Sequence, residues 1–295
     1  RGALIRGAVE KTGTTAIAGG EYVYLKDQTR SKQAADNLAS TNITGVDAAY
    51  YKAHEAGSYR YEPAALTVAK ISRDLDAAYR YLLSSYAGPT SPDVTAVLDE
   101  NTMVGEQALN SRGTHGGLSW NVQHIPLILA GPGVKKGYAS EMPARLVDVA
   151  PTALSVMGIP SRRMDGIVLA DAIESGSPSQ LNSQADLART LRPLQDALIT
   201  KSQQDLAKIR GQSQVTIELD FSKITGRIRS LQGVNAGPLP QRPGEAQLHN
   251  QYRQLGVDYV RTHDVRGAFD INVVFPNMEA DPVKESSYDF KSTDL

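Results

Sequence analysis

The chain has 295 residues, a formal net charge of −1 and 41% apolar residues, which suits a folded protein of one or two domains. The near-zero charge gives no support to a nucleic acid or an anionic membrane as partner, and no run of about eighteen apolar residues could span a bilayer. The absence of cysteine excludes disulfides, thiolate metal ligands and cysteine nucleophiles. Because the chain begins at Arg1 without a signal-like segment, we expect its start to be a cut or a fragment boundary.

The first hundred or so positions predict few regular elements. Residues 1–60 look irregular apart from a short alternating strand at EYVYL, residues 21–25. Between Pro63 and about Tyr86 apolar residues recur at helical spacing, which predicts an amphipathic helix packed on a sheet. VTAVL, residues 94–98, predicts a short buried strand after that helix.

The segment from Ser111 to Val134 holds two of the five histidines, a glycine pair and the only tryptophan. Within it HIPLILA, residues 124–130, is a continuous apolar run that predicts a strand covered on both faces, and a GPGVKKG turn follows. Asp148 then precedes a predicted helix with Pro151 near its start and Gly158 near its end. A strand, a turn and a helix in succession favour an α/β layered fold.

Leucines at 187, 191, 194 and 198 predict one long helix ending near Gly211, packed on a domain and able to cover exposed sheet with its apolar stripe. Beyond Gln214 the pattern changes: VTIELDF predicts a strand, LHNQYRQLGV a helix ending at a glycine, and DYVRTHD a second strand. FDINVVFPN is either a third strand or a loop. This order suggests the opening of a βα repeat structure.

His115 is a candidate metal ligand because neutral imidazole is the commonest zinc ligand and the glycines around it allow close backbone approach. The alternative is that His115 only bonds a loop carbonyl. Spacing alone favours this alternative, since two histidines do not complete a zinc site.

GTHGGLSWNVQHIPLILAGPGVKKG, ARLVDVAPTALSVMGIP and MDGIVLADAI together resemble the C-terminal part of the alkaline phosphatase superfamily, nearest to bacterial alkaline phosphatases related to nucleotide pyrophosphatases/phosphodiesterases. The match covers about residues 90–175 and extends weakly toward residue 1. It implies two zinc ions at the carboxyl ends of a parallel sheet, where a threonine or serine attacks phosphorus. By this resemblance His115 is the last zinc ligand, and Thr114, His124 and Asp148 have supporting or structural roles near the metal. We expect Asp148 to stabilise its helix start by accepting backbone hydrogen bonds.

The chain also departs from that family. The nucleophile, the Asp-x-x-x-His pair and the Asp-His-Gly motif should precede the late histidine, yet residues 1–112 contain none of them. His54, the other histidine there, fits no motif and is expected on the surface. We therefore expect the chain alone to be catalytically incomplete and to hold zinc only if other ligands are supplied.

Residues 230–294 resemble the N-terminal opening of glycoside hydrolase family 39, the β-xylosidase group. The shared features are GVNAGP, QYRQLGV, RTH and YDFKSTD. The resemblance implies a (β/α)₈ barrel that hydrolyses β-glycosides with two glutamates, and it assigns Arg261, His263 and Asn235 to a sugar pocket. The alternative is a local hydrogen-bonded cluster. Neither catalytic glutamate is found, since no glutamate here has the expected Asn-Glu-Pro setting, including Glu245, Glu279 and Glu285.

Together these patterns predict an α/β chain in three parts. Residues 1–175 form a partial alkaline-phosphatase-like layered sheet, residues 176–212 a helical linker, and residues 213–295 the opening β/α units of a (β/α)₈-type barrel. The hypotheses are the C-terminal portion of a zinc-dependent phosphoester hydrolase, the N-terminal portion of a β-xylosidase-like hydrolase, or a non-catalytic structural or interaction piece. The expected partners are a small phosphoester or glycoside and chains that complete the truncated domains. Both families are usually exported, which implies a periplasmic or extracellular location.

Overall fold

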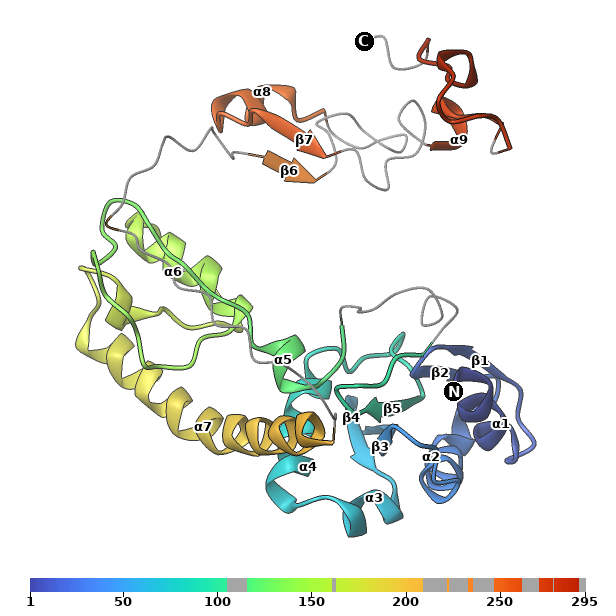
Figure 1. Ribbon diagram of the computed structural model, residues 1–295. Coiled ribbons are helices and arrows are strands. Elements are labelled where there is room, and N and C mark those ends of the chain that lie inside the picture. The colour runs from blue at the N-terminus through green and yellow to red at the C-terminus, as the bar shows by residue number, and fades with distance from the viewer. Residues whose placement is uncertain are drawn as a thin grey trace. The chain divides into compact units, whose positions relative to one another are not determined.

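The computed structural model describes residues 1–104, 116–160, 163–208, 222, 233–235, 247–261, 271–277 and 279–291. The chain divides into unit 1 (Arg1–Ser213) and unit 2 (Gln214–Leu295), drawn in Figure 1. Among the described residues, no helix is both long enough and apolar enough to cross a membrane. The chain is mixed α/β, as the sequence predicts.

Unit 1 is built on a five-stranded sheet in the order β1-β2-β5-β3-β4. Its strands are β1 (Ala16–Gly19), β2 (Tyr22–Leu25), β3 (Val46–Glu55), β4 (Ser58–Pro63) and β5 (Val94–Leu98). Every pairing in it is antiparallel, so the parallel sheet implied by the phosphatase resemblance is not found among the described strands of unit 1. The predicted strand VTAVL is β5, which lies in the centre between β2 and β3.

Helices cover both faces of this sheet. On one face α1 (Gly2–Glu10) and α2 (Ser31–Ser40) pack on an apolar cluster that includes Val94 and Ala96 of β5. On the other face α4 (Arg73–Ser84) contributes Tyr79 and Leu83 to a cluster with Val97 of β5. Alternate residues of β5 therefore face opposite layers, which explains why its residues are apolar except for the buried Thr95.

The expectation that residues 1–60 are irregular is wrong, because α1, α2 and four of the five strands lie there or begin there. A 3₁₀ turn at Gln28–Arg30 precedes α2. The buried face of α2 consists largely of Ala34, Ala35 and Ala39 with a single leucine, Leu38. Small residues allow close packing but give a weak hydrophobic period, so the pattern did not reveal the helix.

The single helix predicted between Pro63 and Tyr86 is two helices, α3 (Ala65–Lys70) and α4, separated at Ile71 and Ser72. The Ser72 hydroxyl accepts a hydrogen bond from the Leu75 N–H at 3.2 Å and caps the start of α4. The apolar periodicity continues across the break, which is why the sequence suggested one helix.

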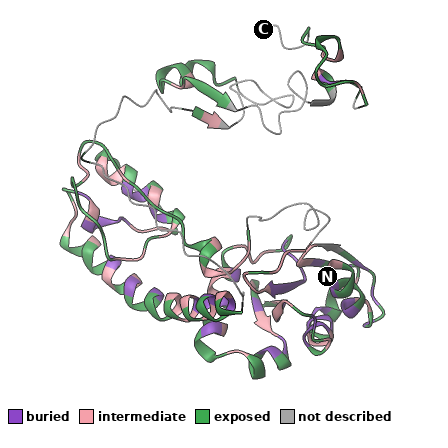
Figure 2. Cartoon of the chain, viewed as in Figure 1, coloured by how far each residue is buried: buried purple, intermediate pink, exposed green. Residues whose placement is uncertain are grey.

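The predicted long helix is α7 (Pro178–Ala207), with 30 residues. It begins at a capping box formed by Ser177 and Gln180, several residues earlier than its leucines indicate. Buried positions recur along it in Figure 2, and Leu198 joins the cluster on the α4 side of the sheet. The stripe packs mainly against α4 and α5 (Trp120–Gln123) rather than directly on the sheet. The helix thus lies within unit 1.

HIPLILA, residues 124–130, is not the predicted buried strand. It pairs with no described strand, and Ile125, Leu127 and Ile128 are exposed, with Ile128 at 86%. Farther on, a 3₁₀ turn at Leu146–Asp148 leads into α6 (Val149–Val156), the helix predicted after Asp148. The 3₁₀ turn η4 (Ala170–Ala172) is held to the GPGVKKG turn by a Lys135 N–H to Ala172 carbonyl bond of 2.9 Å.

Unit 2 contains a parallel strand pair with a helix between the two strands. The strands are β6 (Gly233–Asn235) and β7 (Tyr259–Arg261), and the helix is α8 (His249–Gln254). The helix and the strand predicted from QYRQLGV and DYVRTHD are confirmed, whereas VTIELDF lies outside the described residues. FDINVVFPN was predicted to be a strand or a loop, but it contains the short helix α9 (Ile271–Val274). A 3₁₀ turn follows at Glu285–Ser287.

Candidate functional site

A cavity of about 670 Å³ lies at the carboxyl end of β5 in unit 1. Its volume is in the range of small-molecule sites. Its described lining comes from three stretches: the start of β2, residues 95–104 through and beyond β5, and residues 116–122 with the first part of α5. The lining includes Glu21, Asp99, Glu100, Asn101, Gly116 and Gly117.

The cavity follows from unequal pairing on the two sides of β5. On one side β3 pairs with β5 as far as Leu98, whereas on the other side β2 pairs only with Thr95 and Val94. Beyond the Ala96 N–H, which donates to the Glu21 carbonyl at 2.9 Å, this edge of β5 has no partner among the described strands. The loop that follows β5 and the segment before α5 border the space left there.

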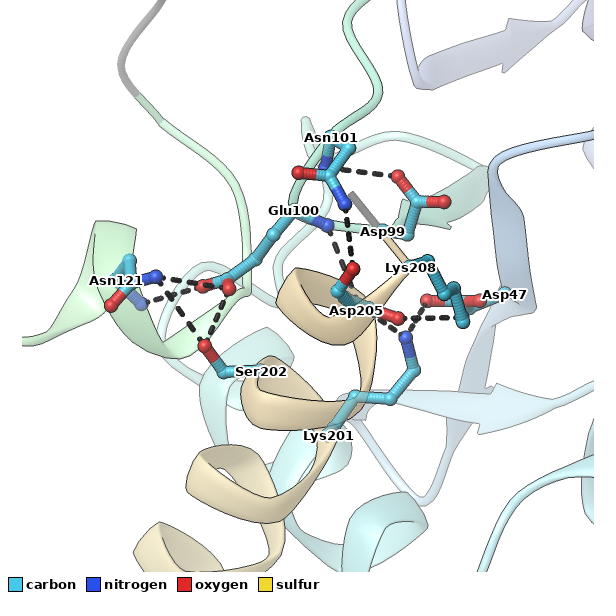
Figure 3. A network of polar contacts seen from close by, with 9 residues as sticks. All are labelled: Asp47, Asp99, Glu100, Asn101, Asn121, Lys201, Ser202, Asp205 and Lys208. Atoms are coloured by element: carbon cyan, nitrogen blue, oxygen red, sulfur yellow. Dashed lines mark hydrogen bonds and ion pairs between the residues drawn. The ribbon is translucent and has the colours of Figure 1, made fainter. Parts of the chain in front are cut away.

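Glu100 is the most highly bonded side chain at this cavity. One carboxylate oxygen accepts the backbone N–H of Asn121 at 2.8 Å, and the other accepts the Asn121 side-chain amide at 3.0 Å. The Ser202 hydroxyl of α7 donates to the second oxygen as well, as Figure 3 shows. The Glu100 carboxylate therefore links the loop after β5, the start of α5 and α7.

Beside Glu100 a charged cluster ties α7 to the sheet. The Lys201 ammonium lies 2.5 Å from a carboxylate oxygen of Asp47, at the start of β3, and 2.5 Å from one of Asp205. Burial raises the pKa of Asp47 despite the contact with Lys201. Burial also acts to raise the pKa of Asp205, but hydrogen bonds from Lys201 and Lys208 outweigh it and hold that pKa below its usual value.

The loop after β5 is fixed on the same helix end. Asp99 accepts the backbone N–H of Asn101 at 3.0 Å, and the Asn101 side-chain amide donates to the Asp205 carbonyl at 3.1 Å. Among the described residues, no three His, Asp or Glu side chains lie close enough to hold a metal ion. Zinc needs three or four protein ligands, and both oxygens of Glu100 already accept hydrogen bonds. The described residues alone do not fit a zinc centre.

Of the residues assigned to the metal site by sequence, Thr114 and His115 lie outside the described residues. The glycines that follow them, Gly116 and Gly117, line the cavity. His124 is exposed and stacks on Trp120, with ring centroids 4.4 Å apart and planes at 13°, and it is not part of the described lining. Its assignment near a metal stays a prediction.

Asp148 is fully buried and has four hydrogen bonds to its carboxylate. Arg145 donates its backbone N–H at 2.8 Å and its guanidinium nitrogens at 2.7 Å and 3.2 Å, and the Ile167 N–H donates at 2.9 Å. The side chain accepts backbone bonds as expected, but from the chain before and after α6 rather than from the first turn of that helix. The bond to Asp148 raises the pKa of the Arg145 guanidinium.

In unit 2 the register places Asn235 and Arg261 directly opposite each other, at the carboxyl ends of the parallel strands β6 and β7. Two of the three predicted sugar-pocket residues are therefore neighbours in the backbone, and His263 lies outside the described residues. Glu279 and Glu285 are exposed, as expected for solvated charges, and Glu245 is not described. His54, at the end of β3, is exposed and stacks on Tyr59 at 4.3 Å.

The sequence reasoning missed Asp99 and Glu100, which line the cavity, and Ser202 and Asp205, which bond to Glu100 from α7. A signal for two of them exists in α7. Its buried face runs from Leu191 through Leu198 and then continues at helical spacing with Ser202 and Asp205, which are also buried. A helix face that turns polar while staying buried indicates a polar site next to it.

No family model matches the chain, and no solved structure matches it. A stretch of 37 residues is 49% identical to "Arylsulfatase K" from Danio rerio, covering 12% of this chain and 7% of that protein. No comparison supports the resemblance to glycoside hydrolase family 39. Sulfatases belong to the alkaline phosphatase superfamily, so a short part of this chain is similar to a hydrolase of that superfamily.

Proposed function

We propose that unit 1 is the C-terminal portion of a metal-dependent phosphoester hydrolase of the alkaline phosphatase superfamily, and that the cavity at the end of β5 is part of its active site. The observation that carries the proposal is the lining of this cavity. Gly116 and Gly117, which follow His115 in the GTHGG motif, border the same space as Asp99 and Glu100. Imidazole and carboxylate are donor types that suit a divalent metal.

The proposed activity is incomplete in this chain. The sequence lacks the family's nucleophile motif and its Asp-His-Gly motif, and no described cluster of side chains holds a metal. Metal dependence therefore rests on the resemblance and on His115. Missing ligands and the nucleophile would come from another segment or another chain.

The experiment measures bound zinc in the purified chain after equilibration with Zn²⁺ and dialysis, together with hydrolysis of nitrophenyl phosphate and nitrophenyl sulfate. We expect weak zinc binding that the His115→Ala variant loses and the matched His54→Ala variant keeps. Because imidazole must be neutral to bind, the zinc is released as pH falls below about 6.5. Both esters stay at background. Equal zinc in the wild type and His115→Ala would contradict the proposal, and ester turnover would show that the site is complete.

A second candidate function concerns unit 2, where the parallel register aligns Asn235 with Arg261. We propose that these residues contribute to a sugar-binding edge, because ligands of βα folds bind at the carboxyl ends of parallel strands. Nitrophenyl xyloside should not be hydrolysed, since neither catalytic glutamate was found. Xylobiose should shift the backbone amide resonances of β6 and β7, and a spectrum without such shifts would reject this candidate in favour of a structural role.

A further inference from the structure

The carboxyl-terminal turns of α7 contact the cavity-lining residue Glu100 through side chains that are polar and buried. Ser202 is 5% exposed and Asp205 is 1% exposed. Burying such groups costs free energy unless they are hydrogen-bonded, and both are bonded to residues at the cavity. Ser202 donates to the Glu100 carboxylate. The Asp205 carboxylate accepts the Glu100 backbone N–H at 3.5 Å and forms ion pairs with Lys201 and Lys208.

Glu100 in turn acts on α5. The first turn of a helix leaves backbone N–H groups without partners, and the N-cap residue Ser119 makes no side-chain capping bond here. The carboxylate of Glu100 takes that role from a distant part of the sequence, accepting the Asn121 N–H at 2.8 Å. The Asn121 side-chain amide binds the other oxygen at 3.0 Å and also approaches the Ser202 hydroxyl at 3.4 Å.

We propose that Glu100 and Ser202 are positioning residues of the cavity: Ser202 orients the Glu100 carboxylate, and Glu100 holds the start of α5 against the end of β5. A carboxylate offers about four acceptor positions, and three are filled by Asn121 and Ser202. Glu100 therefore shapes the wall bearing Gly116 and Gly117 rather than reacting itself. The inference rests on the proposed function only in treating this cavity as the site.

The experiment follows hydrogen exchange of the Asn121 backbone amide by NMR in the full chain. In Ser202→Ala the Glu100 carboxylate loses one donor, and we expect Asn121 to exchange about tenfold faster, relative to the Ala49 amide in the sheet. The Asn121 side-chain amide resonances should shift as well. Ser202→Thr, which keeps the hydroxyl, should restore both signals. A general loss of stability would instead increase the exchange rates of the Ala49 and Asn121 amides together.

Glu100→Gln gives an independent arm, because its amide cannot accept all three donors, and the same local increase at Asn121 is expected. Leu191→Ala is the matched control: it weakens α7 away from the cavity and should leave the exchange ratio unchanged. If Asn121 keeps its wild-type ratio to Ala49 in both Ser202→Ala and Glu100→Gln, the proposal is wrong. An absence of zinc binding would count against the proposed function and would not alter this result.

Discussion

Asp148 is a fully buried carboxylate whose partners lie on both sides of α6, so it joins three pieces of backbone at one point. Its guanidinium partner Arg145 is only 25% exposed. Removing one member of a buried ion pair leaves the charge of the other member without a partner. Here it would also leave the hydrogen-bond donors of Arg145 and Ile167 unpaired.

We expect Asp148→Ala to lower the free energy of unfolding by about 3 kcal/mol, measured by urea denaturation followed by circular dichroism. Asp186→Ala is the matched control, because Asp186 pairs with Arg189 on the surface, where both side chains are more than half exposed. An exposed pair contributes at most about 1 kcal/mol. Equal losses in the two variants would show that the Asp148 cluster does not stabilise the fold.

Asp205 should make stability depend on pH. Its pKa in the folded protein is lowered because the hydrogen bonds from Lys201 and Lys208 outweigh the effect of burial. A lowered folded-state pKa gives stabilisation that is present above the unfolded value of about 3.9 and disappears as pH falls through the folded value. The stability difference between the wild type and Asp205→Asn should thus be full at neutral pH and shrink below about pH 4.

Asp47 provides the contrast of sign within the same cluster. Burial raises its pKa, so the folded state binds a proton more readily than the unfolded chain does. The contribution of Asp47 to stability should rise, not fall, as pH decreases through its folded pKa. Denaturation of Asp47→Asn and Asp205→Asn between pH 3 and pH 7 tests both signs, and parallel pH profiles for the two variants would refute the assignment.

At the residue scale the sequence could predict local chemistry but not distant pairing. The GTHGG glycines and the role of Asp148 as an acceptor of backbone hydrogen bonds follow from short motifs. The contact between Glu100 and Ser202 joins residues 102 positions apart, and no local pattern specifies it. Glu100 also comes shortly after the strand β5, and no sequence motif there indicates that its side chain is part of a hydrogen-bonded network.

At the scale of elements, α7 depends on its apolar stripe for its place beside α4. Leu198 is 6% exposed and lies in the cluster with Tyr79 and Val97. Truncating a buried leucine to alanine costs about 2 to 5 kcal/mol, since it leaves a cavity as well as losing apolar contact. We expect Leu198→Ala to lower stability by this amount in urea denaturation.

Leu181, on the same helix, is 42% exposed, so Leu181→Ala should change stability by less than about 1 kcal/mol. Both substitutions have the same effect on helix propensity, and their difference isolates packing. If the two variants unfold at the same urea concentration, the stripe does not hold α7 on unit 1.

Elements with a strong hydrophobic period were predictable, and elements built from small residues were not. β5, α6, α7, α8 and β7 were each expected close to where they occur. The helix α2 was missed because much of its buried surface comes from alanine. The helix α1 buries Ile5, Ala8 and Val9, and with 9 residues it is too short for a helical period to be recognised in the sequence. HIPLILA was misplaced for another reason: its composition is that of a buried strand, but a strand needs partners, and composition does not supply them.

At the scale of the whole molecule, residues 124–130 leave an apolar segment open to solvent. Ile125, Leu127 and Ile128 are 53%, 41% and 86% exposed. An apolar segment that is exposed and pairs with no strand among the described residues favours association between copies. We expect Ile128→Glu to delay the onset of light scattering on heating without changing stability by more than about 0.5 kcal/mol.

Val283→Glu is the control, because Val283 is 90% exposed and stands between Pro282 and Lys284 rather than in an apolar run, and the substitution adds the same charge. If both variants delay scattering equally, net charge rather than the open segment governs association.

The central place of β5 has a consequence for synthesis on the ribosome. β1 with β2, and β3 with β4, are hairpins that pair locally, but neither hairpin is hydrogen-bonded to the other, because β5 lies between β2 and β3. A nascent chain that has not yet emerged as far as Val94 carries two unjoined hairpins, and two-stranded hairpins are marginally stable in water. Cotranslational closure of the sheet therefore waits for five residues, Val94–Leu98.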